Sequence, residues 1–347
     1  MEQAGITKEQ ANDFCREILP AVSRTFALSI RLLPGDLGAA VRCAYLICRI
    51  ADTLEDEPNL PAESKAELFD LLAACFDDAR SVAAFVSAAT PITGDPAHIR
   101  LVRHSDLVFA AFRLLPDKTR QIVQLWIREM IAGMRKFVLA YPLGVRIQSL
   151  DEYKEYCYYV AGTVGYLLTD LWHEHSPSID APRYAILREG CRAFAEALQT
   201  VNILKDVARD AEHENSIYIP EQLLRAHGTT HATILAPDRA RENRAALSEM
   251  IELAWHDLDQ AKAYLLAIPR RAVSIRLFCA LPLLFAYATL RDLTRSSDAP
   301  GRRSVVKISR SEVKSLTVLS VVGVLSNRAL AGLVERARTR PLSVVPD

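Results

Sequence analysis

Two stretches decide the fold of this chain: Arg49-Ile50-Ala51-Asp52-Thr53-Leu54-Glu55-Asp56 and Asn202-Ile203-Leu204-Lys205-Asp206-Val207-Ala208-Arg209-Asp210. Each reads as a segment of apolar helix that carries acids four residues apart. Four helical residues advance by roughly 400°, so the two acids of each stretch lie on one face, within about 40° of each other. Two such faces could converge on hard cations, which take several oxygen ligands.

Neighbouring residues extend both faces. The first face holds Tyr45, Arg49, Asp52 and Asp56, and the second holds Gln199, Asn202, Asp206 and Asp210. Both helices have substantial apolar surface, where unpaired carboxylates are costly. We therefore expect these acids to meet cations or basic side chains, although a solvated surface is the usual explanation of an acid pair at this spacing.

Composition excludes several classes of protein. In a chain of 347 residues, 50% are hydrophobic and only 13 are glycine, which allows a large helical core. The 42 basic residues balance 42 acidic ones, so no overall field attracts nucleic acid. The seven cysteines are scattered, and no pair or Cys/His cluster has the spacing of a zinc site. We expect free buried thiols and no nucleic-acid partner.

No segment reads as a membrane anchor. The N-terminus lacks the basic start and apolar block of a signal peptide. The longest uncharged apolar run, Leu277 to Leu290, is shorter than the roughly 20 residues that span a bilayer. No basic amphipathic anchor is evident either. We expect a cytoplasmic protein with no transmembrane anchor; peripheral contact with the inner membrane surface, for product release, stays open.

Almost the whole chain has the 3.6-residue periodicity of helices. The expected helices are 8–19, one that stops near 34, 36–57, 62–89, short helices in 100–115, 117–140, one opened by Ser149, 182–210, 221–227, 239–267, 274–292 and 311–338. Pro20 should end the first, and Ile217 to Pro220 should be extended. No break divides the chain, so we expect one all-α domain over 1–340 and a disordered tail over 341–347.

The two acidic faces suggest a chemistry. Magnesium prefers a few carboxylates together with water and substrate phosphates. Two carboxylate faces opposed across an apolar cavity would hold a diphosphate by its metals, help it depart and leave a carbocation in a dry pocket. The pattern therefore points to ionisation-dependent isoprenoid chemistry.

Six motifs in order resemble the squalene/phytoene synthase family, and its squalene branch most closely, over about residues 14 to 335. They are Ser23-Arg24-Thr25-Phe26, Tyr45 to Asp56, Tyr156-Cys157-Tyr158-Tyr159-Val160-Ala161-Gly162-Thr163-Val164-Gly165, Gln199 to Asp206, Phe278-Cys279-Ala280-Leu281-Pro282 and Val306-Lys307-Ile308. The resemblance implies a single-domain isoprenoid synthase helical bundle with a central channel.

The same resemblance implies roles for residues. Magnesium would be bound by Asp52, Asp56, Asp206, Asp210 and Asn202. Farnesyl diphosphate would be bound by Ser23, Arg24, Phe26, Arg49, Gln199, Asn202 and Lys205. Tyr156 would sit beside the carbocation and assist proton removal, with Arg49 and Tyr45 as further catalytic residues. NADPH would be bound near Lys307 and Arg310, in a basic loop.

The implied reaction has two steps. Two farnesyl diphosphates join head-to-head into presqualene diphosphate, which then rearranges and is reduced to squalene by NADPH. The alternatives are a phytoene or dehydrosqualene synthase, which performs no reduction, and an enzyme that stops at presqualene diphosphate. A helical assembly factor without catalysis should have lost acids that this chain keeps.

Several residues depart from the family pattern. Tyr158 replaces a histidine common in the squalene branch, and Ser309 replaces a basic residue. Arg209 stands where an acid often precedes the last aspartate of the second motif. The exit from Asn215 to Pro220 lacks its usual arginine. These departures concern chain length and reduction more than the magnesium-dependent coupling.

Overall fold

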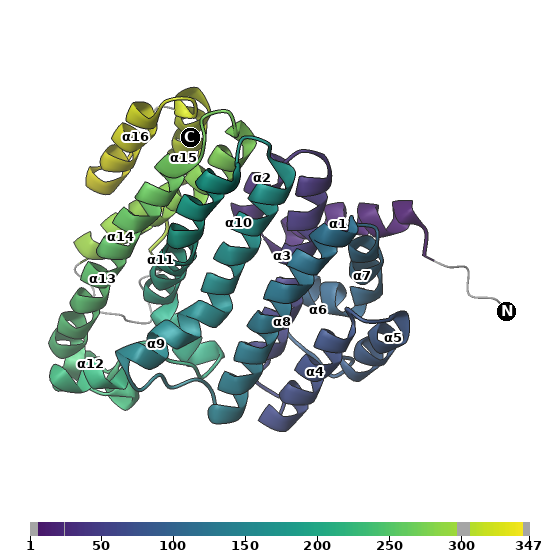
Figure 1. The fold of residues 1–347 in the computed structure, drawn as a ribbon. Coiled ribbons are helices and arrows are strands. Elements are labelled where there is room, and N and C mark those ends of the chain that lie inside the picture. Colours follow the sequence, from purple (N-terminus) through teal and green to yellow (C-terminus); the bar gives the residue numbers. More distant parts are fainter. Residues whose placement is uncertain (1–5, 24, 297–305, 343–347) are drawn as a thin grey trace.

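Helices form nearly all of the regular structure. The structure is a computed structural model that describes residues 6–23, 25–296 and 306–342 (Figure 1). Within these residues there is no strand, only an isolated parallel β-bridge between Arg146 and Ile217. The predicted all-α fold class is confirmed. The part of the expected disordered tail from 343 to 347 and most of the polar insert at 296–303 lie outside the described residues.

The helices follow one another with short connections. Their bounds are α1 (Lys8–Val22), α2 (Thr25–Arg31), α3 (Gly35–Glu55), α4 (Ala62–Ala74), α5 (Ala79–Ala88), α6 (Pro96–Arg103), α7 (Ser105–Arg113), α8 (Asp117–Ala140), α9 (Leu150–Cys157), α10 (Thr163–His175), α11 (Ala181–His213), α12 (Glu221–Ala226), α13 (Ala240–Ala267), α14 (Val273–Arg295), α15 (Arg310–Gly323) and α16 (Asn327–Thr339). A π-helical turn, Tyr158–Gly162, joins α9 to α10.

Local signals explain many of these bounds. Thr7 and Gln10 form a capping box at the start of α1, since each backbone N–H donates to the other's side chain. Pro20 does not end α1, contrary to the prediction, and the helix continues to Val22. Near the helix end a proline removes only one intrahelical hydrogen bond, and the N–H of Ser23 still donates to the carbonyl of Leu19 at 2.9 Å.

Two expected long helices are broken. The one expected over 62–89 divides into α4 and α5, because the carboxylate of Asp78 accepts the N–H groups of Arg80 and Ser81 and starts a new helix. The one expected over 311–338 divides into α15 and α16, where Oγ of Ser326 accepts the N–H of Ala329 at 3.2 Å. In both cases a capping side chain starts the second helix.

Helix α10 separates α3 and α11, the two helices that carry the acidic faces. It packs against both α3 and α11, which form no comparable pair with each other, and it lies between them in Figure 1. Gly165 lets α10 approach α11 closely: a Cβ at this position would lie 2.2 Å from the backbone oxygen of Cys191. The distance between the acidic faces therefore depends on a small residue in α10.

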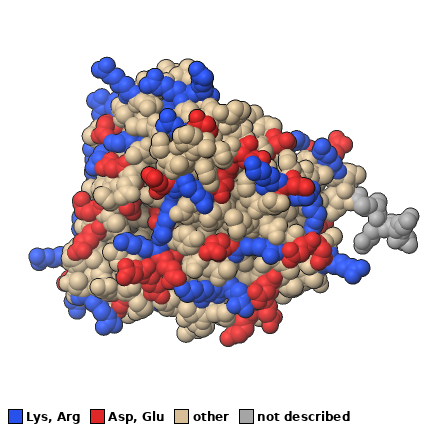
Figure 2. All heavy atoms as spheres, in the orientation of Figure 1, with Lys and Arg blue, Asp and Glu red and all other residues tan. Residues whose placement is uncertain are grey.

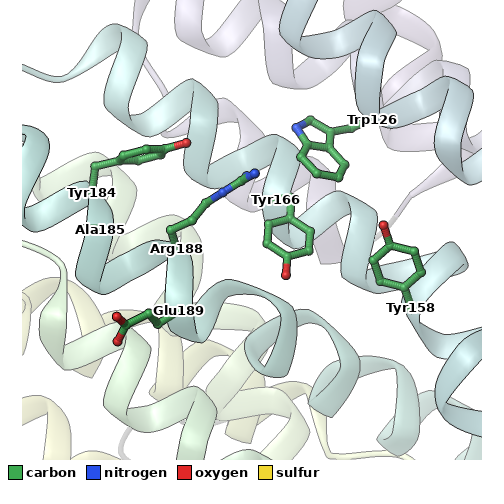
Figure 3. A pocket seen from close by; sticks show the side chains of 7 residues that line it. All are labelled: Trp126, Tyr158, Tyr166, Tyr184, Ala185, Arg188 and Glu189. Atoms are coloured by element: carbon green, nitrogen blue, oxygen red, sulfur yellow. The ribbon is translucent and has the colours of Figure 1, made fainter. Parts of the chain in front are cut away.

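A half-buried carboxylate links three neighbouring helices. Asp170 of α10 accepts hydrogen bonds from Trp126 Nε1 of α8 at 2.7 Å and from Tyr184 Oη and Arg188 Nη1 of α11 at 2.8 and 2.7 Å. The guanidinium of Arg188 also lies over the rings of Trp126 and Tyr166. Figure 3 shows Trp126, Tyr166, Tyr184 and Arg188 around a hollow of about 680 Å³. The network ties α8, α10 and α11 into one rigid layer.

Helix α14 runs through the core. Among the described helices, α14 alone is long and apolar enough to cross a membrane, and 89% of its apolar window is buried inside the structure. It therefore serves here as a core helix, longer than the apolar run seen in the sequence. The seven cysteines are free, and all except the half-buried Cys48 are buried, as expected.

Gly165→Ala is expected to lower the free energy of unfolding by about 2 kcal/mol, because the new methyl group meets backbone atoms of α11 and overpacking typically costs about 1–3 kcal/mol. Gly332→Ala on α16 is the matched control, since its Cβ meets nothing within 4 Å. The control should gain about 0.5–1 kcal/mol from helix propensity. Urea unfolding followed by circular dichroism measures both, and wild-type stability of Gly165→Ala would contradict the close approach.

Candidate active site

The first acidic face forms a chain of contacts along α3. Nη1 of Arg49 lies 3.3 Å from Oδ2 of Asp52, and Nη2 donates to Oη of Tyr45 at 3.3 Å. The ring of Phe26 in α2 lies 5.8 Å from that of Tyr45. Among the described residues, Nε of Arg49 has no hydrogen-bond partner although it is buried. This face thus keeps one donor that could bind an anion.

On α11, Lys205 contacts two residues of the second face. Its Nζ lies 3.1 Å from Oδ2 of Asp206 and donates to Oδ1 of Asn202 at 3.4 Å. Gln199 is half-buried one turn earlier, and Asp210 is buried one turn later. The four polar residues predicted for this face therefore lie along one side of α11, with a lysine among them.

The two faces meet in a group of carboxylates that we call the acidic cluster. Its members are Asp52, Glu55, Asp56, Asp206, Asp210 and Glu214. Burial, followed by the charges of Asp206 and Asp56, raises the pKa of Asp210 to about 7. Burial and the charge of Asp210 likewise raise the pKa of Glu214 to about 7. The effect of Asp56 on Asp210 links α3 electrostatically to α11.

Charge is unevenly balanced within the acidic cluster. Asp52 and Asp206 each have a basic partner, as described above. Among the described residues, Asp56, Asp210 and Glu214 form no ion pair. Asp56 keeps an exposed side at the end of α3, yet the surrounding protein and then the charge of Glu214 raise its pKa well above the usual range. The cluster therefore carries an excess of negative charge that added cations would stabilise.

Basic groups from other helices border the acidic cluster. Nζ of Lys65 in α4 donates to the backbone oxygen of Glu55 at 2.6 Å. Burial, followed by the charge of Arg49, lowers the pKa of His98 in α6, so this imidazole is neutral at pH 7. The charge of Arg209 opposes the rise in the pKa of Asp210, which places Arg209 near the cluster despite its position on the adjacent side of α11.

Tyr156 lies beside the acidic cluster. Its hydroxyl donates to Oε1 of Glu55 at 3.5 Å, and its ring stacks on Tyr218 with centroids 4.8 Å apart. The ring of Phe137 in α8 packs edge-on against that of Tyr156, with centroids 5.1 Å apart. Burial, followed by the charge of Glu55, raises the pKa of Tyr156 well above its usual range, so the phenol stays protonated. The rings of Tyr156, Tyr218 and Phe137 thus form an aromatic wall, and the hydroxyl of Tyr156 contacts the acidic cluster.

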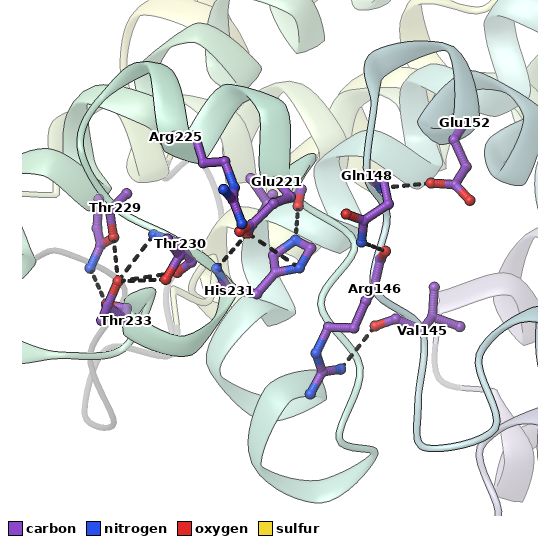
Figure 4. Close-up of polar contacts among 12 residues, drawn as sticks. Val145, Arg146, Gln148, Glu152, Glu221, Arg225, Thr229, Thr230, His231 and Thr233 are labelled. Carbon is purple, nitrogen blue, oxygen red and sulfur yellow. Dashed lines mark hydrogen bonds and ion pairs between the residues drawn. The ribbon is translucent and has the colours of Figure 1, made fainter.

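The expected extended exit holds Tyr218 in place. The N–H of Ile217 donates to the carbonyl of Val145 at 2.8 Å, and Nη2 of Arg146 donates to Oδ1 of Asn215 at 2.6 Å. Gly144 has φ +107, and a Cβ there would lie 1.9 Å from the backbone oxygen of Asn215. The 143–148 loop, part of which appears in Figure 4, thus clamps the segment that carries Tyr218.

Other predicted site residues lie apart from these contacts. Lys307 and Arg310 are exposed at the start of α15. Ser23 is buried at the C-terminal end of α1. Arg24 lies outside the described residues. The structure therefore brings together the metal and tyrosine residues of the prediction, but it does not join the predicted NADPH residues to them.

Two hollows in the surface do not coincide with the predicted site. The first is the aromatic hollow of Figure 3. The second, of about 500 Å³, is lined by residues that include Arg146, Glu221 and His231 (Figure 4). Neither lining contains a residue of the acidic cluster or Tyr156. We place the candidate site at the acidic cluster because charge and hydrogen bonding converge there.

Sequence reasoning missed several residues of the site. Glu214 follows Asp210 by four residues, so the same spacing that singled out Asp206 could have identified it. It was overlooked because the helix was expected to end at Asp210, whereas α11 continues to His213. Glu55 lies inside the first motif, but its contact with Tyr156 depends on tertiary packing. Tyr218 gave no local signal.

The donor set fits divalent cations bound together with an anionic substrate. No group of three His, Cys, Asp or Glu side chains in the described part of the chain is arranged to hold a metal ion directly. Magnesium, however, usually takes one or two carboxylates and completes its shell with water and substrate phosphates. The carboxylates of Asp56, Asp210 and Glu214, which form no ion pair within the described residues, suit that mode of binding, and the charge of Arg49 acts on Asp56 from the same helix.

Known proteins resemble the chain in sequence. Squalene synthase 1 of Arabidopsis thaliana is 27% identical over 299 residues, which cover 86% of this chain and 68% of the relative. The squalene synthase of Schizosaccharomyces pombe is 26% identical over 309 residues, which cover 88% of this chain and 64% of the relative. The chain thus spans about two thirds of the length of these relatives.

Solved structures resemble it in fold. The complex of TcSQS with the ligand BPH1237 matches 95% of this chain and 98% of that chain with a TM-score of 0.79 and 23% identity. A dehydrosqualene synthase in complex with a ligand matches 90% of this chain and 95% of that chain with a TM-score of 0.64 and 21% identity. The predicted single-domain isoprenoid synthase bundle is confirmed. A family model described as squalene/phytoene synthase matches residues 19–312, and the chain belongs to this family.

Proposed function

We propose that the protein couples two farnesyl diphosphates head-to-head into presqualene diphosphate and converts this product to squalene with NADPH. The observation that carries the proposal is the acidic cluster, in which carboxylates of α3 and α11 face each other beside Tyr156. Family membership and the squalene synthases among its relatives support the same reaction. A synthase that performs no reduction, or one that stops at presqualene diphosphate, would use the same cluster.

Magnesium ions would be held by Asp52, Asp56, Asp206, Asp210 and Asn202. When bound, they supply positive charge that neutralises the diphosphate and helps it to depart. Arg49 binds diphosphate oxygens through its guanidinium, which suits phosphate geometry. Lys205 adds a second positive charge on the opposite helix. These two residues orient the substrates while the acids hold the cations.

Tyr156 takes up the proton that leaves the coupled carbocation. Its phenol oxygen accepts that proton, while its own proton passes to Glu55, to which the hydroxyl already donates. Burial, followed by the charge of Asp56, raises the pKa of Glu55 well above its usual range, so this carboxyl group accepts a proton readily when bound cations keep it ionised. The ring face stabilises positive charge next to it. The rings of Phe137 and Tyr218 pack around Tyr156 and exclude water, which would otherwise capture the cation.

We further propose that Lys307 and Arg310 bind the phosphates of NADPH. Both are exposed basic residues at the start of α15, and Ser309 caps that helix by accepting the N–H of Glu312. Exposed cations beside a helix N-terminus suit a phosphate group. Cytoplasmic location and peripheral contact with a membrane also stay predictions.

The product identifies the reaction. Purified protein with magnesium is incubated with farnesyl or geranylgeranyl diphosphate, with and without NADPH, and the extracted lipids are identified by mass spectrometry. We expect squalene only from farnesyl diphosphate with NADPH, and presqualene diphosphate without it. Phytoene from the longer substrate, or dehydrosqualene in place of squalene, would replace the proposal by one of the alternatives.

Stability should fall as the acidic cluster ionises. The pKa of Asp210 is about 7 in the folded protein and about 3.9 in an unfolded chain. The folded state thus binds more protons between these values, and its contribution to stability is lost as pH rises through about 7. In EDTA at pH 8, Asp210→Asn should therefore be roughly 1–2 kcal/mol more stable than wild type. One pKa unit corresponds to about 1.4 kcal/mol, and the full shift is discounted because the neighbouring acids adjust their own ionisation when Asp210 is neutral.

Thermal unfolding from pH 5 to pH 8 measures this difference, with the exposed Asp151→Asn on α9 as control. The gain of Asp210→Asn should fall at pH 5 to roughly a third of its value at pH 8, because Asp210 is then protonated in the folded protein but still ionised in the unfolded chain. Added magnesium should raise the melting temperature of wild type more than that of Asp210→Asn at pH 8. Equal effects of magnesium on both proteins would argue against Asp210 as a metal ligand.

Tyr156→Phe is expected to reduce turnover by about 100-fold or more, the usual contribution of a positioned acid–base group. The ring and its stack on Tyr218 remain, so diphosphate binding should be retained. Tyr141→Phe is the control, because Tyr141 also contacts Phe137 but donates to Glu152 outside the acidic cluster. Steady-state kinetics and binding of a non-hydrolysable farnesyl analogue distinguish the steps. Weakened binding with unchanged turnover would mean that Tyr156 acts only in substrate binding.

A further inference from the structure

Helix α15 carries an apolar face that the fold does not cover. Val318, Val321 and Val322 lie on one side of the helix, and Leu325 follows in the turn to α16; their exposed fractions are 48%, 53%, 79% and 60%. The spacing of three and four residues places them on one side. Leu316 and Val324, on the opposite side, are buried. The exposed side chains therefore lie outside the buried core.

Buried arginines fix both ends of this helix, so its exposure does not result from fraying. At the start, Nη1 and Nη2 of Arg291 donate to the two carboxylate oxygens of Glu312 at 2.8 and 3.0 Å. At the end, Nε of Arg276 donates to the carbonyl of Val324 at 2.8 Å, and Nη2 donates to Oδ1 of Asn327. The apolar face is presented to its surroundings on a rigid support.

The sequence that forms this face carries only positive charges. Between Glu312 and Glu335 there is no acidic residue, and the ionisable residues are Lys314 and Arg328, both exposed. Arg270 and Arg271 are exposed at the start of α14, and the charge of Arg270 contributes, after burial, to the lowered pKa of Arg276 below the turn. Figure 2 shows Lys and Arg side chains among uncharged residues at the end where α15 and α16 lie.

We propose that this face docks on the surface of an anionic lipid bilayer. The α15 surface consists of Val318, Val321, Val322 and Leu325 with Lys314, Arg328, Arg270 and Arg271. Apolar side chains on one face of a helix enter the boundary between headgroups and acyl chains, and surrounding cations attract anionic headgroups. A second copy of the chain would bring the same positive charges together. The complementary charge of an anionic bilayer therefore favours a membrane over self-association.

This inference rests on α15 and its surroundings and does not depend on the reaction proposed for the acidic cluster. It revises the sequence prediction, in which no basic amphipathic anchor was evident. The sequence predicts one helix over 311–338 that includes these valines, and it contains no signal for the break at residues 324–326. The break separates the exposed face of α15 from α16, whose Leu330, Leu333 and Val334 are buried.

Co-sedimentation of the full chain with vesicles tests the proposal. One set of vesicles contains equal parts of phosphatidylcholine and phosphatidylglycerol, and the other contains phosphatidylcholine alone. We expect binding to the anionic vesicles to be at least tenfold tighter, and to weaken as salt screens the charges. The double variant Val322→Asp/Leu325→Asp should bind anionic vesicles at least tenfold more weakly than wild type, and Lys314→Gln/Arg328→Gln should lose the preference for anionic lipid.

A matched control has two exposed leucines replaced elsewhere. Leu125→Asp/Leu143→Asp changes side chains that are 60% and 84% exposed on α8 and in the loop after it, and it should bind vesicles like wild type. Circular dichroism and melting temperature should be unchanged in all variants, because the altered residues are exposed. Equal loss in the control, or equal binding to both kinds of vesicle, would overturn the proposal. So would a dimer in sedimentation equilibrium that Val322→Asp/Leu325→Asp dissociates, which would make α15 a subunit contact.

Discussion

Repulsion between carboxylates of α3 and α11 is the constraint on which the site depends. Asp56 and Asp210 come from helices that form no close pair with each other, so the two helices do not supply the attraction that holds their acids together. That attraction is supplied elsewhere, by the packing of both helices on α10 and by the hydrogen bonds that Asp170 of α10 accepts from α8 and α11. The scaffold holds the acids in place before any cation arrives, as preorganised electrostatic sites require.

The same scaffold places an aromatic wall next to the charges. Tyr156 lies on α9, and its stacking partner Tyr218 belongs to the exit segment after α11. The loop before α9 binds that segment through a single β-bridge and through Arg146. The aromatic part of the site is thus positioned by the loop before α9 and by the exit segment, whereas the acids are positioned by α3 and α11.

The sequence predicted those features that depend on local spacing. Helix periodicity, caps such as Ser149 and the stacking of Asp52 with Asp56 all follow from neighbours within one or two turns. Features that depend on packing were not accessible: the contact of Tyr218 with Tyr156, and the approach of Lys65 and His98 to the acidic cluster. Helix ends were the main error, since Pro20 did not stop α1 and the apolar run before Ser326 contained no signal for the break.

The acidic cluster also explains why the two motifs differ in their partners. In each motif the first aspartate has a basic neighbour, Arg49 for Asp52 and Lys205 for Asp206, whereas the second forms no ion pair within the described residues. Glu214 adds a further unpaired carboxylate beside Asp210. The excess of negative charge therefore lies towards Asp56, Asp210 and Glu214, at the ends of α3 and α11. Cations should gather at that end, while the guanidinium and ammonium groups one turn earlier remain available to the diphosphate.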